Sequence, residues 1–392
     1  MRKVYLDHAA STPVDPKVES AIRPYFGKYF GNPHSMHQFG QATSRAVFES
    51  RRTLAEAVGA SHEEIVFTGS ATEANNLAIR GIWKGLKRDG GLKKPRIVTF
   101  SLEHESILNT CKDLADEGVE TVIIPSDRQG LINMEKFKKA LNADTILVSV
   151  MHANNEVGTI QPIAKIAEII KRFKAALIPN GYTLYPIFHT DAVQSFQYLD
   201  CDAAKLGVDL MTLSAHKIYG PKGIGALYIK KSVRGMMAPI ITGTGQEGGL
   251  RSGTDNVPYM AGFAKAVELV MSSRIKESKR VGDLRDYFWQ QLKKFAPKVL
   301  VNGSLEDRLP NNLSLYFPGY KAHDLLIRLD LSGVGVSPGA ACSSRVSKAS
   351  YVLEEMGFPI ERASGSLRFS LGRATKKADI DYAISVIMKV LG

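Results

Sequence analysis

Short apolar runs alternate with amphipathic helical patterns along most of this chain, and no other feature limits its fold as strongly. Seven runs are short and rich in Val, Ile, Thr or Phe, as β-strands are: Glu64–Thr68, Arg96–Phe100, Thr121–Ile124, Ile146–Met151, Ile187–Thr190, Leu210–Ser214 and Ala226–Ile229. The clearest helical pattern between them, Ile163–Phe173, follows Pro162 and has one apolar face. This order predicts an α/β fold with a mainly parallel, seven-stranded sheet that helices cover on both faces.

The pattern changes at Tyr259. A long helical pattern runs from there to about Lys294, and strand patterns follow at Asn312–Tyr316 and Leu367–Leu371 before a last helix at Ala378–Val390. A length of 392 residues also fits two domains. We therefore expect two domains: a large one over residues 1–258 and a smaller α+β domain over residues 259–392. The first 12 or so residues of the chain could pack on the smaller domain.

Composition excludes several classes of protein. Hydrophobic residues make up 44% of the chain and charged residues 23%, which are globular values and not those of disordered or fibrous chains. No apolar run approaches the roughly 20 residues that cross a bilayer, and no apolar segment follows the N-terminal basic residues as in a secretory signal. We expect a cytoplasmic protein without a disulfide framework, since only Cys111, Cys201 and Cys342 occur.

The chain is basic, with 51 Lys and Arg against 39 Asp and Glu, a net charge of +12. These residues are spread along the sequence, and no basic motif interleaved with aromatic residues accompanies them. The charge therefore favours an acidic partner and gives no strong nucleic-acid signal.

Polar and charged residues follow the ends of the predicted strands. In open α/β sheets, ligands bind beyond the carboxyl ends of the strands. Gly69–Thr72 opens a helix with small residues, whose N–H groups suit a phosphate. The other candidates after strand ends are His104, Asn155, Asp191, Gln194, His216 and Lys217. We expect these groups to converge on one edge of the sheet.

These groups match the needs of pyridoxal phosphate. A buried lysine is costly unless it is neutralised or bonded, and a Schiff base with an aldehyde is one solution. The cofactor also needs a phosphate site and an acidic residue beside its ring nitrogen. Taken singly, Ser70-Ala71-Thr72 could be a helix cap, Asp191 another cap and Lys217 a surface lysine. Their joint placement after strands favours a pyridoxal phosphate enzyme.

Segment Ser214–Gly223 resembles the cofactor-lysine motif of the cysteine desulfurases, the NifS/IscS-like branch of the class V aminotransferases. The resemblance spans nearly the whole chain and includes Tyr5–Pro13, Phe30–Pro33, Ala71–Glu73, Met151–Glu156, Asp191–Ser195, Arg251–Thr254 and Arg368–Arg373. It implies a homodimer of pyridoxal phosphate fold type I, with the cofactor near the subunit interface.

The resemblance also implies roles for individual residues around the cofactor ring. Lys217 would form the Schiff base, and Asp191 would pair with the ring nitrogen. His104 would stack on the ring and move protons. Gln194 and Asn155 would hydrogen-bond around the phenolate oxygen and the substrate. No metal ligands are implied.

Further residues are assigned to the phosphate and the substrate in the same way. The residues implied at the phosphate are Ala71, Thr72, Ser214, His216 and, from the other subunit, Thr254. Arg368 would clamp the substrate carboxylate with two hydrogen bonds, with Asn32 close by.

Cys342 indicates the reaction. It lies in a small-residue segment, Ser337–Arg345, without strand or helix periodicity, and Arg345 and Lys348 could lower the pKa of its thiol. In the family the matching cysteine takes sulfur from L-cysteine, which leaves L-alanine and an enzyme persulfide. The sulfur would pass to an acceptor protein, either an iron–sulfur scaffold or a tRNA-thiolation enzyme. We expect Cys111 in the core and Cys201 at the surface or an edge.

Other interpretations stay open at this stage. Cys342 could be an unreactive turn residue, and the chain could then be a selenocysteine lyase or another class V aminotransferase or lyase. A binding protein that keeps the fold without catalysis is a third possibility. Three features also depart from the family pattern: relatives commonly carry an arginine at or near Gly248, Ala340 stands where a serine is usual, and Ala176–Pro186 is a longer surface excursion than usual.

Overall fold

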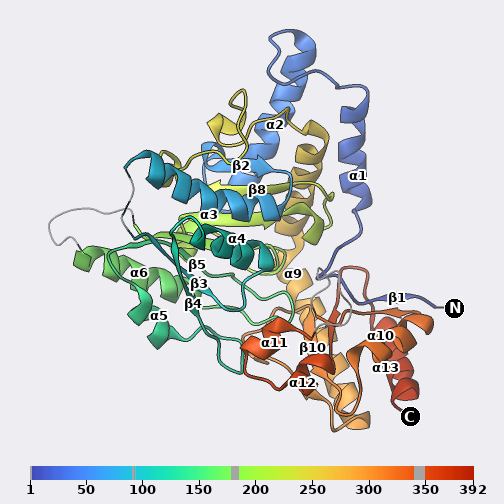
Figure 1. Cartoon of the computed structure of the whole chain (residues 1–392). Coiled ribbons are helices and arrows are strands. Elements are labelled where there is room, and N and C mark those ends of the chain that lie inside the picture. The colour runs from blue at the N-terminus through green and yellow to red at the C-terminus, as the bar shows by residue number, and fades with distance from the viewer. Residues whose placement is uncertain (1, 91, 93, 178–184, 340–348) are drawn as a thin grey trace.

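The computed structural model describes residues 2–90, 92, 94–177, 185–339 and 349–392, and its centre is a seven-stranded sheet (Figure 1). The strands, in spatial order, are β2 (Ile65–Thr68), β8 (Gly225–Ile229), β7 (Leu210–Ser214), β6 (Ile187–Asp191), β5 (Thr145–Ser149), β3 (Arg96–Phe100) and β4 (Glu120–Ile124). Only β8 runs against its neighbours, since it pairs antiparallel with both β2 and β7. The prediction of a mainly parallel sheet is confirmed, and each predicted strand ends within two residues of the observed one.

Helices cover both faces of this sheet. They are α1 (Pro16–Ile22), α2 (Gln38–Ala57), α3 (Ala71–Arg88), α4 (Glu105–Ala115), α5 (Met134–Ala140), α6 (Ile163–Leu177), α7 (Ala203–Leu206), α8 (Lys231–Arg234), α9 (Val257–Phe295), α10 (Ala322–Leu331), α11 (Tyr351–Glu355), α12 (Ile360–Ser364) and α13 (Lys377–Leu391). In β2, Ile65 and Phe67 face one apolar cluster with α2, α6 and the first half of α9, whereas Val66 faces α3 and α4. This alternation follows from the two-residue repeat of a strand.

The C-terminal part of the chain forms a second, smaller assembly. Three antiparallel strands, β12 (Ser366–Ser370), β10 (Asn312–Tyr316) and β9 (Leu300–Val301), pack with α10, α13 and the second half of α9 around their own apolar cluster. The N-terminal strand β1 (Val4–Tyr5) pairs in parallel with β11 (Val334–Gly335), so the start of the chain lies among C-terminal elements (Figure 1).

Helix α9 connects the two assemblies. Its 39 residues form one continuous helix. Phe263 and Val267 in its first half pack in the cluster under the large sheet, whereas Val281 and Phe288 in its second half pack in the C-terminal cluster. The division at residues 258 and 259 therefore falls at the start of a helix shared by both, and it stays a prediction. Most of the predicted excursion Ala176–Pro186 lies outside the described residues.

No helix in the described part of the chain is both long enough and apolar enough to span a membrane.

Candidate active site

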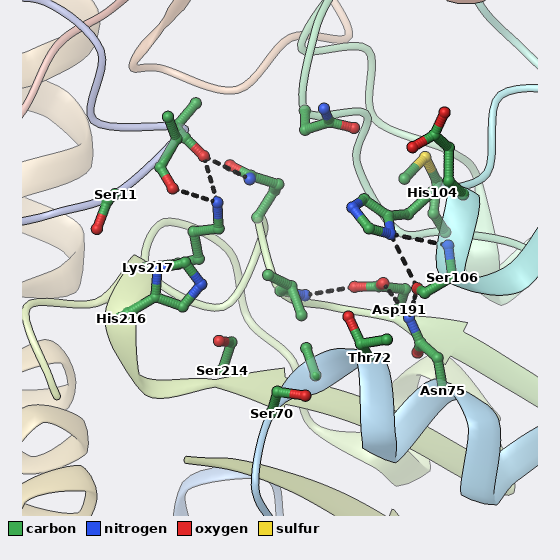
Figure 2. Close-up of a pocket in the computed structure, with 18 of the residues that line it drawn as sticks. Ser11, Ser70, Thr72, Asn75, His104, Ser106, Asp191, Ser214, His216 and Lys217 are labelled. Atoms are coloured by element: carbon green, nitrogen blue, oxygen red, sulfur yellow. Dashed lines mark hydrogen bonds between the residues drawn. The ribbon is translucent and has the colours of Figure 1, made fainter. Parts of the chain in front are cut away.

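A cavity of about 400 Å³ lies where the strands of the large sheet end (Figure 2). Its lining includes most of the residues singled out from the sequence: Ala71, Thr72, His104, Asn155, Asp191, Gln194, Ser214, His216, Lys217 and Arg368. These residues come from both halves of the chain. The predicted convergence on one edge of the sheet is therefore seen in the structure.

The start of α3 forms one wall of the cavity. Ser70 caps this helix, because its side chain accepts a hydrogen bond from the backbone N–H of Glu73 at 3.1 Å. Ala71 and Thr72 follow in the first turn, where backbone N–H groups and the helix dipole favour an anion. Gly225 of β8 lies against this turn: a Cβ there would sit 2.6 Å from the carbonyl carbon of Ser70. A glycine is thus needed for the strand to approach the helix start.

Lys217 reaches the cavity from the turn that follows β7. Its Nζ donates hydrogen bonds to the carbonyl oxygens of Ala9 and Ala10, both at 2.7 Å. Nε2 of Gln194 donates to the same Ala9 oxygen at 3.0 Å (Figure 2). The N-terminal segment thereby provides acceptors for the lysine from a distant part of the sequence.

His216 lies beside Lys217 in the same turn. Burial lowers the pKa of its imidazole to about 4, and the charges of Lys217 and Lys222 act in the same direction. Its Nδ1 is buried and has no hydrogen-bond partner among the described residues. The ring is therefore neutral near pH 7 and leaves one buried nitrogen available for a ligand.

Asp191 ends β6 and is held by two donors. Its Oδ1 accepts from the backbone N–H of Val193 at 2.9 Å, and its Oδ2 accepts from Nδ2 of Asn75 at 3.0 Å. Glu103 lies nearby and is fully buried, and this burial, together with the charge of Asp191, raises the pKa of its carboxyl group well above the usual range. Of these two residues, Asp191 lines the cavity and Glu103 does not.

His104 caps the N-terminus of α4. Its Nδ1 lies 3.1 Å from the backbone nitrogen of Ser106 and 2.8 Å from the Ser106 hydroxyl. Figure 2 shows the other ring nitrogen directed away from Ser106 and toward the side of the cavity where Lys217 lies. Asn75 and Ser106 also line the cavity, and sequence reasoning missed both.

Arg368 enters the cavity from β12 of the C-terminal sheet. Its side chain is 2% exposed, and it donates to Oδ1 of Asp7 at 2.7 Å and to the carbonyl oxygen of Asn155 at 2.9 Å. Its Nε has no partner among the described residues. A guanidinium held in this way can turn its remaining donors toward an anionic ligand.

Ser350 and Tyr351, which follow the predicted cysteine segment in the sequence, also contact the cavity wall. The hydroxyl of Ser350 donates to Oε2 of Glu156 at 2.5 Å, and the hydroxyl of Tyr351 donates to the carbonyl oxygen of Glu103. Gly339, the last described residue before position 349, also lies against Glu156, whose Oε2 is 2.6 Å from the point where a Cβ would stand. Cys342 itself lies outside the described residues.

The other two cysteines are buried. Cys111 lies in the core as expected, and burial raises the pKa of its thiol to about 12. The expectation for Cys201 is wrong, because this residue is fully buried, with its sulfur 3.6 Å from the Ser195 hydroxyl. Its position after Asp200 suggested the surface, but the chain turns inward there to pack on the sheet. Burial raises the pKa of its thiol to about 11.

Asn32 and Thr254 do not line the cavity of this chain. Their two segments nevertheless lie side by side, since Nε2 of His34 is 2.9 Å from Oδ2 of Asp255. Thr254 is exposed. The structure of one chain therefore brings these two predicted residues near each other but not to the other site residues.

Comparison with known proteins agrees with this architecture. The family model described as aminotransferase class V matches residues 4–383. A cysteine desulfurase IscS of Dictyoglomus turgidum is 43% identical over 390 residues, which cover 100% of this chain and 95% of that protein. Among solved structures, a NifS-like protein is 34% identical with a TM-score of 0.90, covering 100% of this chain and 99% of its own. A structure of SspA in complex with cysteine is 32% identical with a TM-score of 0.79, covering 94% and 99%. This chain belongs to the class V aminotransferase family, in its NifS- and IscS-like branch.

Proposed function

We propose that this protein is a cysteine desulfurase that uses pyridoxal phosphate to convert L-cysteine into L-alanine and leaves the sulfur as a persulfide on Cys342. One observation carries the proposal: Lys217, Asp191 and the start of α3 surround a single cavity, in a chain that is similar over its full length to proteins named cysteine desulfurase. The fold and the cavity alone would also suit other enzymes of the family.

The residues of the cavity fit this cofactor. The start of α3 offers backbone N–H groups to a phosphate, and Gly225 lets β8 pack closely against this helix start. The unpartnered Nδ1 of His216 and the hydroxyl of Ser214 lie on the same cavity wall. Asp191 is oriented by two donors and can accept a hydrogen bond from a protonated ring nitrogen. We infer that Ala71, Thr72, Ser214 and His216 hold the phosphate.

The bound cofactor supplies an electron sink that lets bonds to the amino acid break. The protein supplies the rest. Nζ of Lys217 can carry a proton inside the cavity, because the Ala9 and Ala10 carbonyl oxygens stabilise its charged form. His104 presents a ring nitrogen to the same space. Arg368 binds the substrate carboxylate and so fixes the orientation of the amino acid, with Asn155 and Gln194 completing the polar lining.

Cys342 is the sulfur acceptor in this proposal. Its thiolate attacks the substrate sulfur, the C–S bond breaks as an S–S bond forms, and the carbon that loses sulfur gains a proton to give alanine. Among the described residues, Gly339 and Ser350 both lie against Glu156, which lines the cavity. The persulfide sulfur would then pass to an acceptor protein, an iron–sulfur scaffold or a tRNA-thiolation enzyme.

We also propose a homodimer. Large apolar side chains stand exposed between η1 (Arg23–Phe26) and the start of α2, including Phe30 at 70% and Met36 at 92% exposed. They adjoin the His34–Asp255 contact, beside which Asn32 and Thr254 lie. A second copy of the chain would cover these side chains and receive Asn32 and Thr254 at the edge of its own cavity.

The test is alanine release from L-cysteine in the presence of a reductant. Wild type, Cys342→Ala and, as a matched control, Cys111→Ala are compared at equal cofactor content. We expect turnover in wild type and the control and none in Cys342→Ala. Equal turnover in all three would make a lyase, such as a selenocysteine lyase, the better assignment. No turnover in wild type would contradict the desulfurase assignment; other amino acids would then be tested as substrates, and a binding protein would remain if none reacts.

A further inference from the structure

Asp191 and His104 are connected by two side chains that no motif in the sequence indicates. Nδ2 of Asn75 donates to Oδ2 of Asp191 at 3.0 Å and to Oγ of Ser106 at 2.9 Å. The same Ser106 oxygen lies 2.8 Å from Nδ1 of His104. Figure 2 shows these four side chains as one hydrogen-bonded group, contributed by β6, α3 and the start of α4.

The orientation of the Asn75 amide follows from its neighbours. An ionised carboxylate only accepts hydrogen bonds, so the amide must turn its NH2 group toward Asp191. Asn75 is 1% exposed, and its Oδ1 has no partner among the described residues. A buried amide oxygen without a partner is unfavourable, which indicates that this orientation is maintained by the two hydrogen bonds on the other side.

The position of the proton on Ser106 follows in turn. Because the Ser106 oxygen accepts from Asn75, its own O–H is available for Nδ1 of His104. The backbone N–H of Ser106 is directed at the same nitrogen, 3.1 Å away. A proton on Nδ1 would face this backbone N–H and abolish the cap of α4. Nδ1 must therefore act as an acceptor, which places the ring proton on Nε2.

We propose that Asn75 and Ser106 are positioning residues that hold the His104 imidazole in its neutral form with the proton on Nε2, and fix it relative to the carboxylate of Asp191. The network turns the donor nitrogen toward the cavity, where it can hydrogen-bond to an anionic group of the bound amino acid or cofactor. This last consequence rests on the proposed function. The tautomer itself does not, because it follows from contacts within the chain.

Nuclear magnetic resonance of the full-length protein with 15N-labelled histidine tests the proposal. Two-bond 1H–15N correlations separate a ring nitrogen that carries a proton from one that does not, and His104→Gln assigns the signals. Spectra are recorded on the holoenzyme and again after removal of the cofactor. We expect an unprotonated Nδ1 and a protonated Nε2 in both. A protonated Nδ1 in the wild type would overturn the proposal without any variant.

Variants then test the two bridging residues. In Ser106→Ala and Asn75→Ala the backbone N–H of residue 106 still faces Nδ1, so we expect only part of the Nδ1 signal to shift toward the protonated value, whereas Ser106→Thr, which keeps a hydroxyl, should give the wild-type signal. Asn76→Ala is the matched control, because Asn76 is half-buried on the same helix and its amide bonds to Thr72, Arg80 and Thr110 but not to Asp191 or Ser106. Wild-type signals in both alanine variants would overturn the bridging role. An inactive protein with the expected tautomer would contradict only the desulfurase proposal.

Discussion

Arg368 is a buried arginine that already donates two hydrogen bonds within the chain, to Asp7 and to Asn155. If it also binds the substrate carboxylate, replacement by lysine keeps the charge but removes the paired donors. Loss of a charged hydrogen bond corresponds to about 1.5–3 kcal/mol. For Arg368→Lys we therefore expect the KM for L-cysteine to rise roughly 10- to 100-fold, measured by alanine release.

Arg285→Lys is the control for this substitution. Arg285 is also mostly buried, with its side chain 13% exposed, but it donates to the Leu309 carbonyl oxygen away from the cavity. Its KM should match that of wild type. An unchanged KM with a lower kcat in Arg368→Lys would show that Arg368 acts elsewhere than at the substrate carboxylate.

His189 makes the stability of the protein depend on pH. It is fully buried in β6 between the hydroxyls of Ser149 and Thr212, and burial lowers the pKa of its imidazole to about 3. Below its ordinary pKa of about 6.5 the unfolded chain binds a proton that the folded chain does not, so stability falls as the pH decreases. One such histidine contributes a loss of about 1.4 kcal/mol between pH 7.5 and 5.5.

Urea unfolding at these two pH values measures this loss. We expect His189→Gln to be less stable than wild type at pH 7.5 but to lose less stability on acidification. His323→Gln, which replaces an exposed histidine of α10, should keep the full pH dependence of wild type. The same pH dependence in His189→Gln and wild type would contradict the assignment.

The sequence predicted those cavity-lining residues that carry a distinctive chemical group after a strand, such as Lys217, Asp191 and His104. It missed Asn75, because this residue lies inside a regular helical pattern and acquires its role only when α3 packs beside β6. It missed Tyr351 for a related reason, since the partner of its hydroxyl is a backbone oxygen 248 positions away. Hydrogen bonds between distant segments leave no local pattern.

At the level of elements, the long buried strands and helices could be predicted closely. The strand at Asn312–Tyr316 has the predicted bounds, and the last helix differs from its prediction by one residue at each end. The two-residue strands β1, β9 and β11 were missed, because so short a segment has no measurable periodicity. The reversed direction of β8 was also invisible, since a strand buried on both faces looks alike in either direction.

The contact between β8 and α3 gives a prediction for a whole element. In Gly225→Ala, the added Cβ would lie 2.6 Å from a backbone atom of Ser70, and neither strand nor helix can move without disturbing the sheet. Overpacking of this kind destabilises by about 1–3 kcal/mol. Because the strain falls on the helix start that we propose holds the phosphate, affinity for pyridoxal phosphate should fall about 10-fold or more, as measured by equilibrium dialysis.

Gly235→Ala is the matched control, because a Cβ at this position meets nothing within 4 Å and the backbone is already right-handed there. We expect wild-type affinity for the cofactor and a change in unfolding free energy within about 0.5 kcal/mol. An unchanged cofactor affinity in Gly225→Ala would indicate that the phosphate is held elsewhere.

The whole molecule explains why the site needs segments from the entire chain. The N-terminal residues reach Lys217 because β1 pairs with β11 in the C-terminal assembly, and Arg368 reaches the same cavity from β12. The surface around Phe30 and Met36 remains uncovered in a single chain, as do the two predicted residues beside it. The family resemblance assigns Thr254 to the cavity of the other subunit and Asn32 to the neighbourhood of the substrate, and both assignments stay predictions, because neither residue lines the cavity of a single chain.

Mixed dimers test whether each site takes Thr254 from the other subunit. Lys217→Ala and Thr254→Val chains carry different tags, and the dimer that contains one of each is purified. If Thr254 serves the partner's cavity, one of the two sites combines an intact Lys217 with an intact Thr254, so the mixed dimer should show about half of the wild-type activity. If Thr254 serves its own cavity, the mixed dimer should show only about half of the lower activity of the Thr254→Val homodimer.

Cofactor content is measured in parallel, because loss of one hydrogen bond to a charged phosphate weakens cofactor binding by about 1.5–3 kcal/mol. A preparation that sediments as a monomer would contradict the shared site, since a single chain leaves Thr254 exposed and away from the cavity.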